Sequence, residues 1–213
     1  MTPELRERLE ALLSTGNRTI LGIVGSPGSG KSTLAAQVVE EVGALAVVVP
    51  MDGFHLAQTE LVRIDRADRK GAPDTFDAAG YVALLRRLRA EEGTVYAPEY
   101  RRDLRNPVAG AIAVPAQVRL VVTEGNYLLL DVGPWAGVRE RFDEVWFCGP
   151  DDALRLERLV RRHERFGKDP RSALAWATGP DGRNAVLVEA TRHRADLVVG
   201  PDVLDLLTPT DAG

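Results

Sequence analysis

The sequence has one cysteine, Cys148, among 213 residues, which excludes both a disulfide framework and a thiolate metal site. It has no apolar run near the roughly 18 residues of a membrane span. Basic residues are few for a nucleic-acid binder, because Lys plus Arg total 27 against 31 for Asp plus Glu, a net charge of −4. The amphipathic, charged N-terminus is unlike a secretory signal. We therefore expect a cytoplasmic globular protein that binds neither nucleic acid nor membrane.

Strand and helix patterns alternate along the chain, which predicts an α/β fold with a mainly parallel sheet. Residues 19–24 form a continuous β-rich run, as expected of a strand buried on both faces, and further strands are predicted at residues 44–49, 119–123, 144–147 and 195–199. Apolar positions recur at helical spacing in residues 3–13, 32–41, 77–89, 154–165 and 185–193. Residues 90–109 mix Pro, Gly and charge and are predicted to form a surface loop. No linker interrupts the pattern, so one domain is expected over residues 1–213.

A glycine-rich segment follows the first predicted strand and opens the next helix. It fits the P-loop pattern G-x-x-x-x-G-K-[ST] at every fixed position and reads Gly25-Ser26-Pro27-Gly28-Ser29-Gly30-Lys31-Ser32. The glycines let backbone N–H groups turn toward an anion, and the helix adds its positive N-terminal end. We expect Lys31 to reach the β- and γ-phosphates, Ser32 to bind Mg²⁺ and Thr33 to reach the α-phosphate. The sequence therefore predicts a nucleoside triphosphate site.

Asp52 follows the second predicted strand, which we expect to neighbour the P-loop strand. Ligands of parallel sheets bind at the carboxyl ends of the strands. Phosphoryl transfer needs a group there that orients, and can deprotonate, the acceptor hydroxyl. We assign that role to Asp52. The alternative is a turn aspartate ahead of Gly53, a common pairing.

Glu124 closes the apolar run at residues 119–123 and is a second carboxylate at a strand end. At this position a P-loop protein holds Mg²⁺ or polarises water. A solvated loop acid is the alternative. The P-loop upstream favours the metal role for Glu124.

Arginines recur at spacings of three, four and three residues in one predicted helix, at Arg155, Arg158, Arg162 and Arg165. This spacing places them on one helical face. Such a face can close over a polyphosphate and stabilise charge on the transferring group, as a lid over approximately residues 151–170. Arg158 and Arg162 are the first candidates. A solvated helix paired with its own glutamates is the alternative.

The order of these features resembles the P-loop small-molecule kinases grouped with uridine kinase, bacterial pantothenate kinase and phosphoribulokinase. The resemblance covers about residues 19–199 and is strongest to the nucleoside/nucleotide kinase-like proteins, some labelled fructose-transport-system kinases. The shared segments read MDGFHL from Met51, KGAPDTFD from Lys70 and EGNYLLL from Glu124. The resemblance implies a three-layer α/β/α fold with a helical lid, ATP and Mg²⁺ as cofactors, and a small-molecule acceptor.

The resemblance also implies acceptor and nucleotide contacts. His55, three residues after Asp52, is a candidate acceptor contact, with a structural histidine as the alternative. Tyr100 lies in a stretch, Ala97-Pro98-Glu99-Tyr100, similar to one whose tyrosine contacts the acceptor. Arg192 lies in a segment that packs near the adenine in the pantothenate kinase branch.

One departure from uridine kinases concerns the acceptor. Those kinases carry an acid that holds the ribose, where this chain has Lys70-Gly71-Ala72-Pro73. A simple nucleoside is therefore disfavoured. Lys70, Arg102 and Arg105 suit an anionic acceptor, such as a carboxylate or a sugar phosphate. Ordinary surface charge is the alternative for these residues.

The leading prediction is an ATP-dependent phosphotransferase that moves the γ-phosphate to a hydroxyl of a small metabolite. The alternative is a P-loop regulatory NTPase, or switch, that hydrolyses nucleotide to control a partner. GTPase switches carry an Asn-Lys-x-Asp motif, and this sequence has none. Asp77-Ala78-Ala79-Gly80 matches a second switch pattern in letters but opens a predicted helix. The expected partner is a small-molecule acceptor, and a homodimer remains open.

Overall fold

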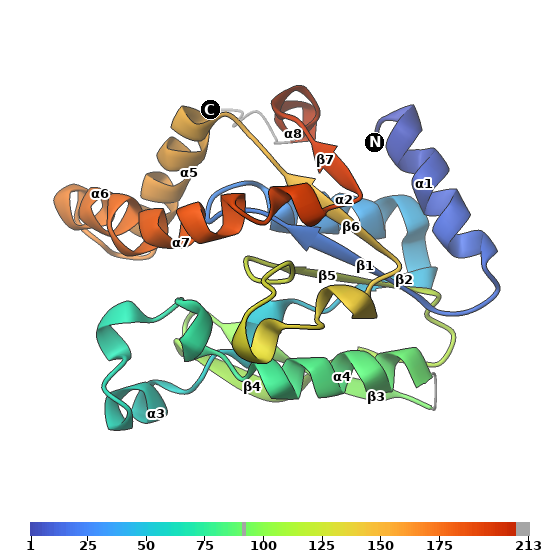
Figure 1. Cartoon of the computed structure of the whole chain (residues 1–213), viewed down its shortest axis with the longest axis horizontal. Coiled ribbons are helices and arrows are strands. Elements are labelled where there is room, and N and C mark those ends of the chain that lie inside the picture. Colours follow the sequence, from blue (N-terminus) through green and yellow to red (C-terminus); the bar gives the residue numbers. More distant parts are fainter. Residues whose placement is uncertain (91–92, 208–213) are drawn as a thin grey trace.

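The computed structural model describes residues 1–90 and 93–207, with side chains as far as Leu204 (Figure 1). The helices are α1 (Pro3–Ser14), α2 (Lys31–Val42), α3 (Gln58–Arg63), α4 (Ala78–Ala90), α5 (Asp152–Arg165), α6 (Pro170–Thr178), α7 (Pro180–Glu189) and α8 (Pro201–Leu207). The strands are β1 (Thr19–Val24), β2 (Ala46–Val48), β3 (Val95–Arg101), β4 (Asn106–Val114), β5 (Leu120–Gly125), β6 (Glu144–Cys148) and β7 (Leu197–Val199). The helices within these described ranges are all too short or too polar to cross a bilayer.

The main sheet is parallel, with the strand order β2-β5-β1-β6-β7. Every residue of the two central strands β1 and β5 is buried, because helices or loops cover both faces. This is why their sequences are continuous apolar runs rather than alternating ones. The predicted parallel sheet is confirmed.

Two apolar cores lie on opposite faces of this sheet. On one face, α1 and α2 contribute Leu9 and Leu34, and α8 adds Leu204. On the other face, α4 contributes Tyr81, and the loop after β5 contributes Trp135. Figure 1 shows α1, α2 and α8 on one side of the strands and α4 on the other. The predicted three-layer α/β/α architecture is confirmed.

The strand that leads to Asp52 does not neighbour the P-loop strand, so that expectation is wrong. β5 lies between β2 and β1, and the backbone N–H of Val49 donates to the carbonyl of Val122 at 2.8 Å. A buried apolar pattern reveals that a strand is covered on both faces, and it carries no information about which strand lies beside it. As a consequence Glu124, at the end of β5, stands between the P-loop and Asp52.

Residues 90–109 were predicted to form a surface loop, and that prediction is also wrong. β3 and β4 pair there as an antiparallel ribbon whose register shifts between Ala97 and Glu99, around Pro98. Proline and glycine normally interrupt central strands, but a two-stranded ribbon has two free edges and tolerates both. The ribbon packs closely on the Asp52 segment, since a Cβ atom at Gly53 would overlap the carbonyl oxygen of Pro98.

Candidate active site

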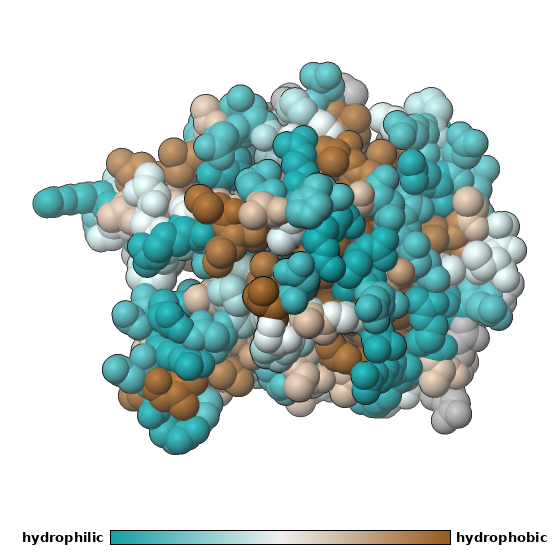
Figure 2. Space-filling view, viewed as in Figure 1, coloured by the Kyte–Doolittle hydropathy of each residue, from teal (hydrophilic) through white to brown (hydrophobic). Residues whose placement is uncertain are grey.

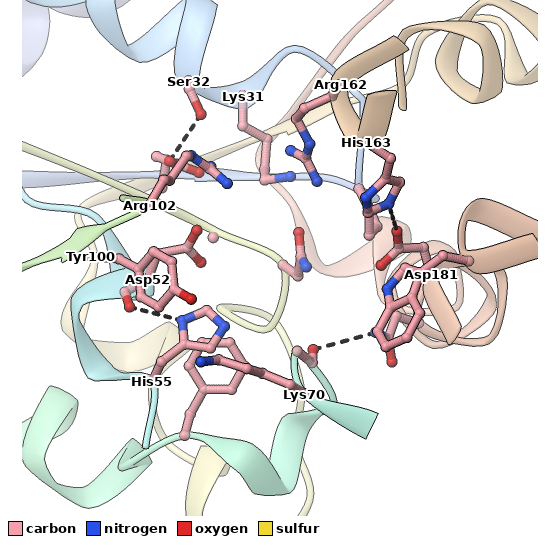
Figure 3. A pocket seen from close by; sticks show the side chains of 18 residues that line it. Lys31, Ser32, Asp52, His55, Lys70, Tyr100, Arg102, Arg162, His163 and Asp181 are labelled. Atoms are coloured by element: carbon pink, nitrogen blue, oxygen red, sulfur yellow. Dashed lines mark hydrogen bonds and ion pairs between the residues drawn. The ribbon is translucent and has the colours of Figure 1, made fainter. Parts of the chain in front are cut away.

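A cavity of about 240 Å³ lies between the P-loop, the segment after β2 and the helices α5–α7. Most of the predicted catalytic, metal and acceptor residues line it, namely Lys31, Ser32, Asp52, His55, Lys70, Tyr100, Arg102, Glu124 and Arg162 (Figure 3). Pro27, a third residue of the P-loop, also lines the cavity. The carboxyl ends of the parallel strands therefore bring together residues far apart in the sequence.

The P-loop backbone takes the conformation that its glycines permit. Gly28 and Gly30 have φ angles of +86° and +91°, in the left-handed region. Gly30 precedes α2 and supplies no side-chain cap, so the first N–H groups of α2 are available to an anion. Lys31 is buried, and its ammonium donates to the carbonyl of Ser26 at 3.1 Å. Burial lowers the pKa of Lys31, while Glu124 opposes that shift.

Ser32 and Glu124 meet at the end of β5. The Ser32 hydroxyl donates to Oε1 of the Glu124 carboxylate at 3.0 Å. Burial, and then Asp52, raise the pKa of Glu124, whereas Lys31 lowers it. Mg²⁺ commonly takes one or two protein oxygens together with substrate phosphates and water. A hydroxyl and a carboxylate beside the P-loop fit that preference.

Asp52 and His55 lie in and directly after a 3₁₀ turn, Met51–Phe54. His55 Nδ1 is 2.8 Å from the backbone carbonyl oxygen of Asp52. A carbonyl only accepts hydrogen bonds, so Nδ1 carries the proton and Nε2 keeps its lone pair. Burial lowers the pKa of His55, which favours the neutral ring. The ring packs between Phe76 and Tyr100, with centroids at 4.0 and 4.7 Å.

The predicted acceptor-side cations divide between the cavity and its entrance. The Lys70 ammonium lies 5.3 Å from the centre of the Tyr100 ring and donates to the carbonyl of Arg105 at 2.8 Å. Arg102 lines the cavity and also lies over the Phe166 ring, at 5.3 Å. The Arg105 side chain lies further out and does not line the cavity.

The four arginines of α5 have different environments. Arg162 lines the cavity, and burial lowers its pKa. Arg155 is buried and donates from Nη1 to the carbonyl of Pro27 at 3.0 Å, so it fastens α5 to the P-loop. Arg158 is half-buried and outside the cavity, and Arg165 is exposed beyond its mouth. The regular spacing of the four arginines in the sequence therefore does not reveal that their environments in the structure differ.

Several cavity residues were not predicted, including Asn126, His163, Asp181 and Asn184. His163 Nε2 lies 2.7 Å from Oδ2 of Asp181, which joins α5 to α7 (Figure 3). Asn184 donates to the carbonyl of Gly71 at 3.3 Å. Asn126 could have been predicted from the sequence, because it lies two residues after Glu124 at a strand end. Asp181 and Asn184 of α7 form no sequence pattern that would have identified them.

Trp176 also lines the cavity. It is half-buried, and the Lys168 ammonium lies 4.3 Å from the centre of its ring. The other two tryptophans, Trp135 and Trp146, are buried in the cores.

Arg192 lies outside this cavity. It lines a separate pocket with Gly149, Pro150 and Arg155, and its guanidinium lies 5.8 Å from the centre of the Phe147 ring. The P-loop borders this region too, because the Ser26 hydroxyl lies 3.2 Å from the Glu189 carboxylate of α7. Thr33 is half-buried on the first turn of α2.

The chain matches no protein-family model. It is 35% identical over 208 residues to the protein named "Putative uridine kinase C227.14" from Schizosaccharomyces pombe, covering 92% of this chain and 88% of that one. It is also 35% identical to a pantothenate kinase from Allorhizobium ampelinum, covering 92% of this chain and 69% of that protein.

Among solved structures, one described as a "putative fructose transport system kinase" from Silicibacter sp. TM1040 matches with a TM-score of 0.84. It is 35% identical and covers 93% of this chain and 99% of that one. The chain belongs to the P-loop small-molecule kinases of the uridine kinase and pantothenate kinase group. It is an ATP-dependent kinase of small molecules, and its relatives carry the names of different acceptors.

Proposed function

We propose that this kinase transfers the γ-phosphate of ATP to a hydroxyl group that Asp52 holds, on a metabolite other than a simple nucleoside. The observation that carries the proposal is the arrangement of Lys31, Glu124 and Asp52 around one cavity. The first belongs to the P-loop, the second ends the middle strand, and the third follows the strand beyond it. Donor and acceptor groups thus converge on a shared space.

Asp52 acts on the acceptor side. Its carboxylate orients the acceptor hydroxyl and takes its proton as the oxygen bonds to the γ-phosphorus. The bond from that phosphorus to the β–γ bridging oxygen breaks, and ADP leaves. The Nε2 lone pair of His55 accepts a second hydrogen bond from the acceptor. The lysine-containing segment Lys70-Gly71-Ala72-Pro73 has no carboxylate for a ribose.

Lys31 and Arg162 act on the donor side. Both are cationic groups that line the cavity, and their partial burial strengthens their attraction for the phosphates. Ser32 and Glu124 would hold Mg²⁺, which when bound supplies positive charge to the β- and γ-phosphates. We propose α5 and the segment following it, approximately residues 151–170, as the lid of a single kinase domain.

A switch that hydrolyses nucleotide to control a partner is the second candidate. It needs no acceptor site, whereas this cavity continues past the P-loop to His55, Tyr100 and Trp176. That continuation favours the kinase.

ADP release from purified protein with ATP and Mg²⁺ tests the proposal. The acceptor panel contains pantothenate, nucleosides, sugars, sugar phosphates and glycerate. We expect one class of acceptor to stimulate turnover and to gain a phosphate, detected by mass spectrometry. Turnover that ignores every acceptor and responds only to a protein partner contradicts the kinase proposal and supports the switch.

A further inference from the structure

A groove leads outward from the active-site cavity, between the turn after β3 and the end of α5. We call it the outer groove, and its volume is about 790 Å³. The residues that it shares with the inner cavity make the two continuous, and these are Lys70, Tyr100, Arg102, Arg162, His163 and Trp176. On the left of Figure 2 the surface is indented between the helices α5–α7 above and the segment that carries α3 below.

The outer groove is strongly cationic. Its six basic side chains are Lys70, Arg102, Arg105, Arg162, Arg165 and Lys168. Asp103 is its one carboxylate, and that group already pairs with Arg101 at 2.8 Å. Among the side chains that the structure describes, in residues 1–90 and 93–204, no ion pair joins any of the six to a carboxylate. A protein of net charge −4 therefore concentrates positive charge at this entrance, and the carboxylates that act on Arg162, namely Asp52, Glu124 and Asp181, line the inner cavity rather than the groove.

Burial, together with electrostatic repulsion between these cations, lowers the pKa of two of them. Burial, and then Arg105, lower the pKa of Lys70. Burial, and then Arg102, lower the pKa of Arg162. A bound anion would relieve this repulsion.

The backbone of Arg105 points to the same conclusion. Its φ angle is +53°, in the left-handed region where glycine or asparagine is favoured over other residues. An arginine at this position therefore costs stability relative to glycine. Its side chain lines the outer groove. Strain of this kind is a signature of function when the side chain faces a site.

Aromatic rings flank the cations on both walls. Arg102, from the hairpin, lies over Phe166 at the end of the lid helix, with 5.3 Å between the guanidinium carbon and the ring centre. Lys168 lies over Trp176 within the lid. These contacts hold the positive groups against the walls and leave the space between them to a ligand.

The P-loop contributes no residue to the outer groove, so the phosphates of ATP do not account for its charge. We propose that the outer groove binds a phosphate ester group of the acceptor, whose hydroxyl lies at Asp52. This inference rests on the proposed function. A phosphate monoester has three terminal oxygens and nearly two negative charges, which suits several converging basic groups better than one carboxylate does.

Binding of inorganic phosphate tests the groove directly. The P-loop is first filled with Mg²⁺ and a non-hydrolysable ATP analogue, and phosphate is then titrated by calorimetry. We expect Arg165→Gln and Arg105→Gly each to weaken phosphate binding about tenfold, as expected for loss of a charge-assisted hydrogen bond. Arg171→Gln, which removes an exposed lid charge outside the groove, should change it less than about twofold.

The two groove variants differ in their effect on folding, which separates a binding role from a structural one. Arg105→Gly removes the backbone strain of an arginine in the left-handed region. We therefore expect an unchanged or higher melting temperature together with weaker phosphate binding. Equal phosphate affinity in the wild type, both groove variants and the Arg171→Gln control overturns the inference.

Matched acceptor pairs identify the source of the phosphate. Ribose is compared with ribose 5-phosphate, fructose with fructose 6-phosphate, and uridine with uridine 5′-monophosphate, by ADP release. We expect a phosphorylated member to have a KM at least about tenfold lower than its partner, and Arg165→Gln to erase that difference. Equal KM values within every pair that is turned over overturn the inference and leave the kinase proposal standing.

Two further outcomes are distinguishable. A phosphorylated compound that binds and inhibits, without being phosphorylated, makes the groove an inhibitor site and overturns the acceptor assignment. If no acceptor stimulates turnover and a protein partner does, the proposed function fails. The calorimetric titration then still decides whether the groove binds phosphate.

Discussion

Nη1 of Arg155, on the first turn of α5, donates a hydrogen bond of 3.0 Å to the carbonyl oxygen of Pro27 in the P-loop. The same guanidinium pairs through Nε with Asp152 at 2.7 Å. The α5 backbone also lies against the loop, because a Cβ atom at Gly28 would be 2.6 Å from the Arg155 carbonyl oxygen. The first turn of α5 thus supports the P-loop.

We therefore expect Arg155→Met to weaken ATP binding about tenfold and to lower stability by about 2 kcal/mol, the contribution of a buried charged hydrogen bond. Methionine keeps much of the side-chain volume and removes the donor. Calorimetry with a non-hydrolysable ATP analogue and thermal unfolding measure the two effects. Arg161→Met, on the exposed side of α5, is the matched control. Equal behaviour of the two variants contradicts this role.

Variants of Asp52 and Lys31 should separate effects on the phosphoryl transfer step from effects on nucleotide binding. Asp52→Asn keeps the shape of the side chain and removes the base, so we expect turnover to fall at least about 100-fold with ATP affinity within a few-fold. Lys31→Ala should damage both, because the ammonium contacts the phosphates. The measurements are ADP release and ATP-analogue titration. Loss of nucleotide binding in Asp52→Asn would show that the roles are assigned wrongly.

The Ser32–Glu124 hydrogen bond predicts where Mg²⁺ acts. Ser32→Ala should raise the Mg²⁺ concentration needed for half-maximal turnover by about tenfold, because it removes one of the two protein oxygens. Glu124→Gln should raise it too. The measurement is the rate as a function of free Mg²⁺ at saturating ATP. Ser172→Ala, on the exposed start of α6, is the control. An unchanged Mg²⁺ dependence in both site variants excludes this metal position.

His55 predicts a pH dependence of stability. Its folded pKa is lowered by burial, so between the unfolded value near 6.5 and the lower folded value the unfolded chain binds more protons. Stability from this group is therefore complete above about pH 6.5 and is lost as pH falls through that window. His55→Gln should show a shallower fall of melting temperature in the same window. The exposed His193→Gln variant should follow the wild type. Parallel curves for the His55 variant and the wild type contradict the prediction.

Gly53 should be intolerant of any side chain. A Cβ atom there would overlap the carbonyl oxygen of Pro98, which belongs to the backbone of β3 and cannot move alone. We expect Gly53→Ala to lower stability by about 1–3 kcal/mol and to raise the acceptor KM. Gly200→Ala has open space and no left-handed backbone, so it is the matched control. Thermal unfolding and acceptor titration provide the readouts.

The sequence predicts the layers of this fold well, but it predicts the order of the strands within the sheet poorly. The five strands of the main sheet and helices α1, α2, α4 and α5 were predicted within a few residues, because burial of one or both faces imposes a period on the sequence. A helix was expected over residues 185–193, whereas α7 spans Pro180–Glu189. The position of β5 between β2 and β1 was missed, because pairing partners leave no such period. The β3–β4 hairpin was missed because Pro98 and Gly110 resemble loop residues and its outer face is exposed.

The candidate site shows the same division. Residues that follow strands, such as Asp52 and Glu124, could be predicted because parallel strands end at one edge. His163 and Asp181 could not, since they come from different helices and their 2.7 Å contact exists only once the helices pack. Arg155 and Arg162 shared one helical pattern, and only packing assigned the first to the P-loop and the second to the cavity.

Helix α7 makes polar contacts with the P-loop and with the segment beside Lys70, which we propose to bind different substrates. Its Glu189 carboxylate lies 3.2 Å from the Ser26 hydroxyl of the P-loop, and its Asn184 side chain donates to the carbonyl of Gly71, beside Lys70. These contacts hold α7 at its middle and at its C-terminal end, so they tie the position of the P-loop to that of the segment beside Lys70. We expect ATP and acceptor to bind with positive cooperativity, and thermodynamic reciprocity requires each to tighten the other by the same factor. Kinetically, such an enzyme holds both substrates together before either is released.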